Sequence, residues 1–143
     1  MPWVHSSALW GHKKVVRLLL EQGADKSSTS KNGATPLHYA SHSGRQNVVG
    51  LLIEHGADLS ATDNDGMTSL HRAARLGRKQ SVVLLLEHGS DTSAQTNDGR
   101  TPEDVAIAGG HAEIVTMIKA EQMRKAVKVI MGELDEQGAL QED

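Results

Sequence analysis

Residues 33–58 read GATPLHYASHSGRQNVVGLLIEHGAD, and nearly the same pattern returns in residues 66–91 as GMTSLHRAARLGRKQSVVLLLEHGSD. A third copy, GRTPEDVAIAGGHAEIVTMIK, occupies residues 99–119, so that each copy begins 33 residues after the previous one. A fixed period of this length indicates stacked supersecondary units, none of which can bury its apolar face alone. The repetition therefore predicts an elongated solenoid.

The same period extends toward the N-terminus, where a shortened first copy is recognisable. Its Gly11 and Asp25 stand 33 residues before Gly44 and Asp58 of the next copy. We expect one continuous stack over residues 1–119 with no linker inside it. The predicted repeats occupy about residues 1–29, 30–62, 63–95 and 96–119.

Local signals in the second copy predict two helices joined by tight turns. Asn32 and Gly33 favour a close reversal of the chain, because glycine tolerates the positive φ that such a turn needs. Thr35 fits the N-cap of a short helix, and Pro36 fits its first position, where no amide hydrogen is required. Gly44 can end this helix before an apolar second helix follows. The predicted fold class is all-α, built from helix-turn-helix repeats with short hairpin loops.

The second helices should supply most of the core, because the chain has no Phe, one Tyr and two Trp. Their apolar residues form a face wide enough to contact the helices before and behind. Leu51 and Leu84, which are one period apart, are predicted to be buried on this face. Replacing either with alanine should cost about 2 to 5 kcal/mol through lost packing.

One four-residue motif points to a family. T-P-L-H at residues 35–38 recurs with changes at residues 68–71 and 101–104, each time at a fixed distance from a helix-ending glycine. Over roughly residues 3–119 the chain resembles ankyrin repeat proteins. The resemblance implies an ankyrin-type α-solenoid of L-shaped units, whose hairpin tips and first helices line a concave face that binds other proteins in that family.

The amino-acid composition argues against several classes of function and site. The 143 residues carry a formal net charge of -3, which argues against general nucleic-acid binding, and the absence of cysteine excludes disulfides and thiolate zinc sites. The longest apolar runs, such as residues 82–86, are too short to span a membrane, and no secretory signal is visible. We expect no cofactor, no membrane span and an intracellular location, cytoplasmic or nuclear.

The eight histidines raise the question of a metal site. His38 and His42 stand four residues apart on one predicted helix, as paired metal ligands can. However, His38 occupies the same motif position as His5 and His71, so a hydrogen-bonding role between backbone segments explains it better. Motifs for a nucleophile elbow, a phosphate-binding loop or a zinc protease are absent from the sequence. We predict neither a metal site nor enzymatic activity.

Residues that differ between repeats are the candidates for recognition, because the residues fixed by the period hold the stack together. Apolar or amphipathic contacts of the kind that dominate interfaces would come from Trp10, Tyr39, Met67 and Leu76. Central arginines would attract an acidic segment, mainly by steering and orientation. The predicted partner-binding set is Trp10, Tyr39, His42, Met67, Arg72, Arg75, Leu76 and Arg100.

The preferred function is non-catalytic binding of a protein or peptide on the concave face, with an acidic segment as one candidate ligand. An alternative is a regulatory or targeting fragment of a larger enzyme or adaptor. In that case the repeats would only bring the active part of the larger protein to its target. A third hypothesis is nucleic-acid binding through the arginines. For the preferred hypothesis, reversing the charge of Arg72 and Arg75 should abolish capture of the partner and leave the melting temperature nearly unchanged.

The N-terminal end looks unfinished, because Leu9 and Trp10 crowd a region that no preceding unit covers. This arrangement would allow end-to-end self-association through the uncapped N-terminus.

The final segment, residues 120–143, is predicted to be a capping helix followed by an acidic tail. Its apolar stripe follows 4, 3 and 4 spacing and is out of phase with Val115 and Ile118. A kink near residues 120–122 would let the stripe fold back over the open end of the stack. The alternatives are a helix offered to a partner or to a second copy, and disorder. The stripe consists of Met123, Val127, Ile130 and Leu134.

Overall fold

The computed structural model describes residues 3–138, and within this range the chain forms eight helices and no strand. The predicted all-α fold class is therefore confirmed. In chain order the helices are α1 (Trp3–Trp10), α2 (Lys13–Glu21), α3 (Pro36–His42), α4 (Gln46–Glu54), α5 (Ser69–Leu76), α6 (Lys79–Glu87), α7 (Pro102–Ala108) and α8 (Ala112–Gly138). Residues 139–143 of the predicted acidic tail lie outside the described range.

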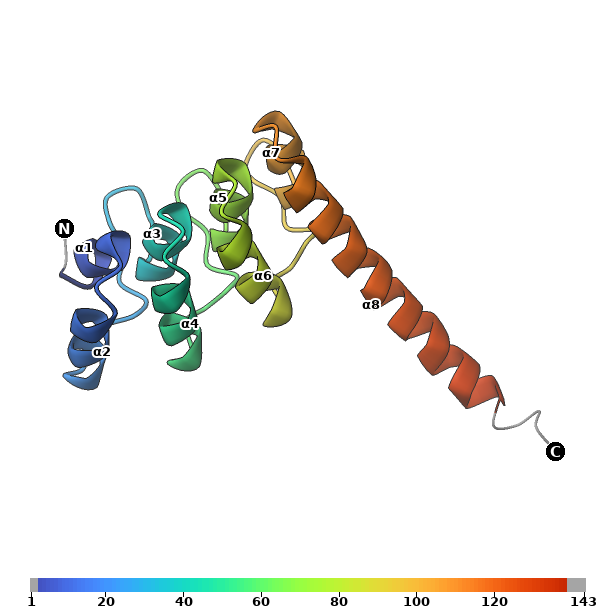
Figure 1. The fold of residues 1–143 in the computed structure, drawn as a ribbon, viewed down its shortest axis with the longest axis horizontal. Helices are drawn as coiled ribbons and strands as arrows, with labels where there is room; N and C mark the ends of the chain where they lie inside the picture. Colours follow the sequence, from blue (N-terminus) through green and yellow to red (C-terminus); the bar gives the residue numbers. More distant parts are fainter. Residues whose placement is uncertain (1–2, 139–143) are drawn as a thin grey trace.

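The helices form two parallel rows in an elongated stack (Figure 1). The first helices α1, α3, α5 and α7 pack one on the next, and α2, α4, α6 and α8 do the same in the second row. A single apolar core runs between the rows along the whole stack, and its largest fully buried members include Leu37, Leu52, Leu70 and Leu85. The predicted solenoid is thus the observed architecture.

In each of the last three repeats, the first helix (α3, α5 or α7) begins with a capping box. The Thr35 hydroxyl accepts a hydrogen bond from the amide of His38 at 3.3 Å, and Nδ1 of His38 accepts from the amide of Thr35 at 3.0 Å. Thr68 and His71 repeat this arrangement in α5, and in α7 the carboxylate of Asp104 replaces the imidazole. Two otherwise unpaired amides are satisfied at each helix start.

The motif histidines also connect neighbouring repeats. Nε2 of His38 donates to the carbonyl oxygen of Met67 at 2.8 Å, and Nε2 of His71 donates to that of Arg100 at 3.0 Å. Because Nδ1 accepts from the capping threonine amide, these bonds require the neutral ring protonated on Nε2. The predicted role of these histidines as links between backbone segments is confirmed.

Acid should weaken the stack through these two rings. Burial is the main cause that lowers the pKa of His38 and His71 from the ordinary value of 6.5. The unfolded chain therefore takes up protons at a higher pH than the folded chain does. The contribution of these two histidines to the free energy of unfolding is fully present above their pKa in the unfolded chain. It is lost as the pH falls from that pKa toward their lower pKa in the folded chain.

We expect a lower urea midpoint at pH 5.5 than at pH 7.5, measured by circular dichroism. Replacing both rings with glutamine keeps the capping geometry and removes the titration. The double variant His38→Gln/His71→Gln should show a smaller difference between the two pH values. Equal midpoints for the unmodified chain would contradict the assignment.

A second set of bonds between repeats was not predicted. The residue after each inter-helix glycine reaches back 36 positions to a carbonyl oxygen in the previous repeat: Arg45 to Leu9 at 3.4 Å, Arg78 to His42 at 3.0 Å and His111 to Arg75 at 3.0 Å. At Gly77, where φ is +76°, a Cβ atom would lie 2.6 Å from the His111 ring. Glycine is therefore needed both for the turn and for this close approach.

The C-terminal helix differs from the predicted cap. α8 continues without a break through residues 120–122 and leaves the stack at an angle (Figure 1). The four residues of its apolar stripe are between 50% and 69% exposed. The predicted kink and fold-back over the last repeat are therefore wrong. No glycine or proline stands between residues 111 and 131, and a fold-back would break several consecutive helical hydrogen bonds.

None of the helices within residues 3–138 combines the length and the apolar character needed to cross a membrane.

Candidate functional site

A surface cleft of about 420 Å³ lies between the hairpin tips at residues 63–67 and 96–100. Its walls also include one residue of α5 and one of α7. We call it the tip cleft; it is lined by Asp65, Met67, Arg75, Thr96, Asn97, Asp98, Arg100 and Val105. Three of the predicted partner-binding residues, Met67, Arg75 and Arg100, meet here although they are far apart in sequence.

The hairpin tips that border the cleft are tied to one another. The Asn64 side chain donates to the carbonyl oxygen of Lys31 at 3.0 Å, and the Asn97 side chain donates to that of Asn64 at 2.8 Å. The amide of Asn97 also donates to the carbonyl oxygen of Asp65 at 3.0 Å. These bonds recur with the repeat period and fix the spacing of the tips, so the cleft is built on a preformed frame.

The tip cleft contains charges of both signs. Arg100 lies 3.5 Å from Asp98, but both side chains are more than half exposed, so this pair is weak. The Thr96 hydroxyl donates to Asp98, which is the main reason that the pKa of Asp98 is lowered. Arg75 is exposed and takes part in none of the ion pairs found in the described residues. Its guanidinium is therefore available to a carboxylate from outside.

Arg72 has a different role from Arg75. Its guanidinium donates from Nη2 and Nε to Oδ2 of Asp63 at 2.8 and 3.1 Å, and the Asp63 side chain is only 2% exposed. Oδ1 of Asp63 accepts from the amides of Asp65 and Met67 at 2.9 and 3.0 Å. Arg72 therefore fastens a hairpin tip to α5. The expectation that it is exposed for a partner is wrong.

Ionisation of Asp63 depends on these contacts. Burial by itself would raise the pKa of this carboxyl group, but the hydrogen bonds from Arg72 and from the two amides outweigh burial. The net effect lowers the pKa from its ordinary value. Asp63 is thus a charged anchor of the tip.

Three other predicted residues are less accessible than expected. Met67 is only 7% exposed, because it follows the turn glycine and both its amide and its carbonyl group bond within the stack. Its side chain still borders the tip cleft. Tyr39 is half-buried against the core, with its ring centroid 5.4 Å from that of His5. Leu76 is also half-buried. None of the three is a fully exposed contact.

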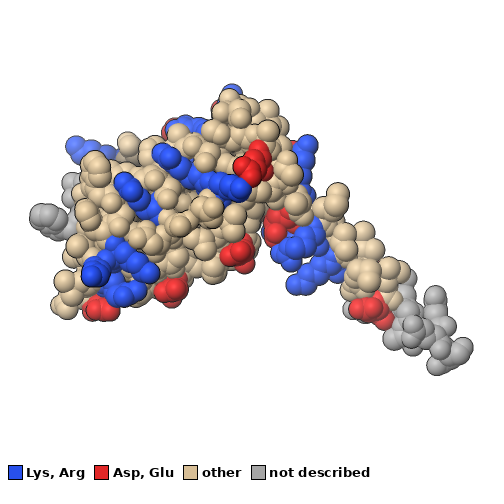
Figure 2. Space-filling model, viewed as in Figure 1, with Lys and Arg blue, Asp and Glu red and all other residues tan. Residues whose placement is uncertain are grey.

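His42 lies in a positive environment. Its pKa is lowered first by burial and then by the nearby charges of Arg72, Arg75 and Arg78. Figure 2 shows Lys and Arg side chains across the upper part of the repeat stack and in a further group at its lower left, with Asp and Glu mostly along the lower edge. An anion that approached His42 would meet these arginines.

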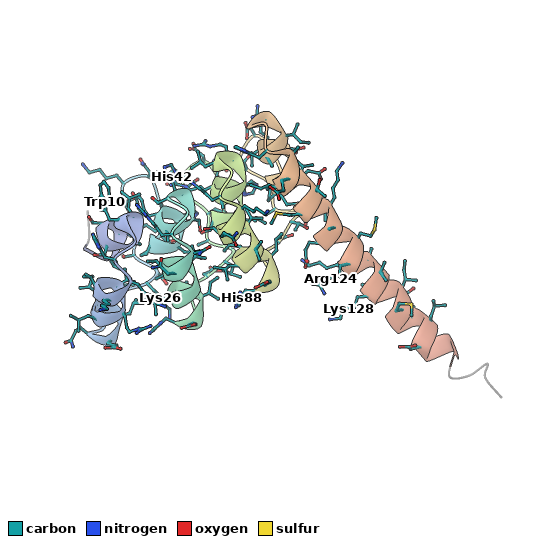
Figure 3. All side chains as sticks on the ribbon, in the orientation of Figure 1. Trp10, Lys26, His42, His88, Arg124 and Lys128 are labelled. Atoms are coloured by element: carbon teal, nitrogen blue, oxygen red, sulfur yellow. The ribbon has the colours of Figure 1, made fainter. Side chains whose placement is uncertain are left out.

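Trp10 is 62% exposed, but it lies at the α1 end of the stack, away from α5 and α7 (Figure 3). The structure therefore does not bring it together with the tip cleft. In α2 of the same repeat, Val15 and Leu18 are 45% and 57% exposed, whereas Val48 and Leu51 one period later are 0% and 2% exposed. These residues form an uncovered N-terminal face.

The part of the chain that the structure describes holds no candidate metal centre. Among residues 3–138, no three His, Asp or Glu side chains gather closely enough to hold a metal ion. His42, the second member of the pair considered from sequence, accepts a bond from Arg78 through its backbone carbonyl group.

Comparison with known families agrees with this architecture. The family model described as ankyrin repeats (3 copies) matches residues 3–63 and 60–128. No curated protein matches the chain. Repeats of this family generally serve as protein-protein interaction modules and are typically non-catalytic. The matches cover most of the chain and coincide with the helix pairs, so the chain belongs to the ankyrin repeat family.

Proposed function

We propose that the chain binds an acidic segment of another protein in the tip cleft. The observation that carries this proposal is the exposed guanidinium of Arg75, which lines the cleft beside Arg100 and has no ion-pair partner in the described structure. A carboxylate on the ligand would pair with Arg75 and compete with Asp98 for Arg100. Arginine suits this role, because its planar fork can hold a carboxylate with two hydrogen bonds.

The surroundings of the cleft support an acidic ligand over a basic one. The arginines near His42 place further positive charge beside the cleft, on α5 and at the start of α6. Asp65 and Asp98 would orient the ligand by repelling acidic groups from the outer rim and accepting hydrogen bonds from its backbone. Met67 and Val105 provide apolar contact at the cleft wall. Individual exposed ion pairs contribute only about 0.2 to 1 kcal/mol, so several contacts must act together.

Charge reversal in the cleft should abolish capture of the partner. We expect Arg75→Glu/Arg100→Glu to reduce binding at least tenfold with a nearly unchanged melting temperature, because both side chains are exposed. The measurement is a pull-down with mass-spectrometric identification, followed by titration of the captured protein's acidic segment.

The matched control is Lys14→Glu/Arg17→Glu on α2. These side chains are also exposed, and the change in net charge is the same. Equal loss in both variants would indicate a non-specific charge effect, and unaltered capture by the cleft variant would place the site elsewhere.

Two alternatives remain distinct from this proposal. If the stack is a regulatory or targeting part of a larger enzyme or adaptor, the same cleft would recruit that protein's partner or substrate. If the arginines bind nucleic acid, duplex DNA should bind at low salt, with affinity falling steeply as salt rises. We also propose end-to-end association through the uncovered N-terminal face as a second mode of binding, since Val15 and Leu18 hold positions that are buried one repeat later.

A further inference from the structure

The part of α8 beyond the repeats exposes more apolar surface than any other helix. Six of the ten large hydrophobic side chains that are strongly exposed lie on this part of α8, between residues 123 and 134. We use the name α8 stripe for Met123, Val127, Ile130 and Leu134, which are 69%, 50%, 54% and 52% exposed. A helix without tertiary packing is only marginally stable in water, so this segment gains from being covered.

The α8 stripe faces away from the chain's own repeats. On the opposite side of α8, Ile114 and Ile118 are 2% and 0% exposed, and the Glu121 side chain is 13% exposed. With 3.6 residues per turn, the buried set and the stripe are centred about half a turn apart. A continuous α8 therefore cannot lay its stripe on α6. Among the described residues nothing covers the stripe, which leaves it open to another molecule.

The spacing of the stripe indicates that another helix covers it. Steps of 4, 3 and 4 residues place Met123 and Ile130 at d positions and Val127 and Leu134 at a positions of a heptad. Such a seam packs its side chains between those of a helix with the same spacing. The chain itself carries one such helix, which makes a second copy a fitting occupant.

The charges along α8 select the orientation of that second helix. Between residues 119 and 128 the exposed or half-exposed charged side chains are four basic ones and Glu121, which pairs with Arg124, and beyond Gly132 they are acidic. Figure 3 shows Arg124 and Lys128 along α8. The basic set is Lys119, Arg124, Lys125 and Lys128, and the acidic set that the structure describes is Glu133 and Asp135. In an antiparallel pair the basic half of each helix lies beside the acidic half of the other, whereas a parallel pair places like charges together.

We propose that α8 pairs antiparallel with α8 of a second copy, giving a two-fold symmetric dimer. Val127 then packs against Ile130 of the second copy, and Met123 packs against its Leu134. In this register the net-basic stretch of each helix, residues 119–128, lies beside the acidic stretch of the other, and Arg124 keeps its ion pair with Glu121 of its own helix. The interface is remote from the tip cleft and does not depend on the proposed function. If that function also holds, the dimer presents two clefts to one partner, which raises its avidity.

Sedimentation equilibrium of the full chain tests the proposal. The expected mass is twice the 15.3 kDa of one chain. Val127→Asp/Ile130→Asp should raise the dimer dissociation constant at least 100-fold and give a monomer. The matched control is Val129→Asp, because Val129 is 62% exposed on the same turn but points away from the stripe. The control should remain a dimer.

The orientation can be tested separately, because the chain contains no cysteine. Single variants Met123→Cys and Leu134→Cys are mixed and mildly oxidised. The antiparallel pair predicts a disulfide between the two different variants and almost none within either one alone. Self-crosslinking of Met123→Cys alone would overturn the antiparallel arrangement.

Three further outcomes would overturn the proposal. One is that the unmodified chain stays monomeric at concentrations up to 1 mM. This outcome includes the case in which the α8 stripe binds a different protein and not a second copy. Another is a dimer that survives Val127→Asp/Ile130→Asp. The third is a dimer lost on Leu18→Asp, which would assign self-association to the uncovered N-terminal face. Circular dichroism at 222 nm checks that the repeat stack of every variant is folded.

Discussion

Replacing Arg72 with alanine is expected to lower the free energy of unfolding by about 3 kcal/mol. The substitution leaves the Asp63 carboxylate, whose side chain is 2% exposed, without its positive partner. Removing one member of a buried ion pair is strongly destabilising, because an uncompensated charge stays in the interior. Urea denaturation at pH 7.5 measures the change. Arg72→Glu should be at least as harmful, since it would bring two carboxylates together.

The fourth repeat offers a matched control for this pair. One period after Asp63 and Arg72, the chain has Thr96 and Val105, and the Thr96 hydroxyl accepts from the amide of Arg100 at 3.1 Å. The double variant Asp63→Thr/Arg72→Val copies that solution and should recover most of the lost stability. If the double variant were as unstable as Arg72→Ala, the loss would come from packing and not from the unpaired charge.

Replacing Leu85 with alanine is expected to cost about 2 to 5 kcal/mol. Its side chain is 0% exposed and belongs to the core that joins successive repeats. The cavity left behind would be bordered by helices on both sides, which limits how far the site can relax. Chemical denaturation monitored by circular dichroism gives the change in the free energy of unfolding.

Leu84 is the natural comparison for Leu85. The prediction that Leu84 is as buried as Leu51 is wrong, because Leu51 is 2% exposed whereas Leu84 is only half-buried. Leu51 belongs to α4, which packs against α6 of the next repeat. Leu84 belongs to α6, and α8, the next helix of the second row, leaves the stack at an angle (Figure 1). Leu84→Ala should therefore cost less than half as much as Leu85→Ala. Equal losses would contradict the difference in burial.

Most of the repeat could be predicted from the sequence, because its signals act over a few residues. A threonine cap such as Thr35 bonds three positions away, and a turn glycine such as Gly44 acts on its own φ. The regular recurrence of His38 and His71 also indicated a role in the stack, which their bonds to the next repeat confirm. These features repeat, so each copy supports the interpretation of the others.

The candidate site was only partly accessible from sequence. Arg72 and Arg75 differ in the same way from their counterparts in other repeats, yet one is held by Asp63 and the other faces the tip cleft. The pairing of Arg72 with Asp63 occurs in one repeat, so the period gives no sign of it. Acidic residues that also differ between repeats, such as Asp63, could have suggested an ion pair with one of the arginines. The sequence does not show which arginine forms that pair.

The repeat unit, its helix starts and turns, and the order in which the units stack could all be predicted from the amino-acid sequence, because they depend on local hydrogen bonds and on a repeated apolar pattern. The folded stack was needed to show which arginine is available, that Met67 is buried and that α8 continues past the repeats. The physical reason is that each of these outcomes depends on which surface another element covers. Whether a surface is buried by another element depends on the whole assembled stack, so it cannot be predicted from the pattern within one repeat.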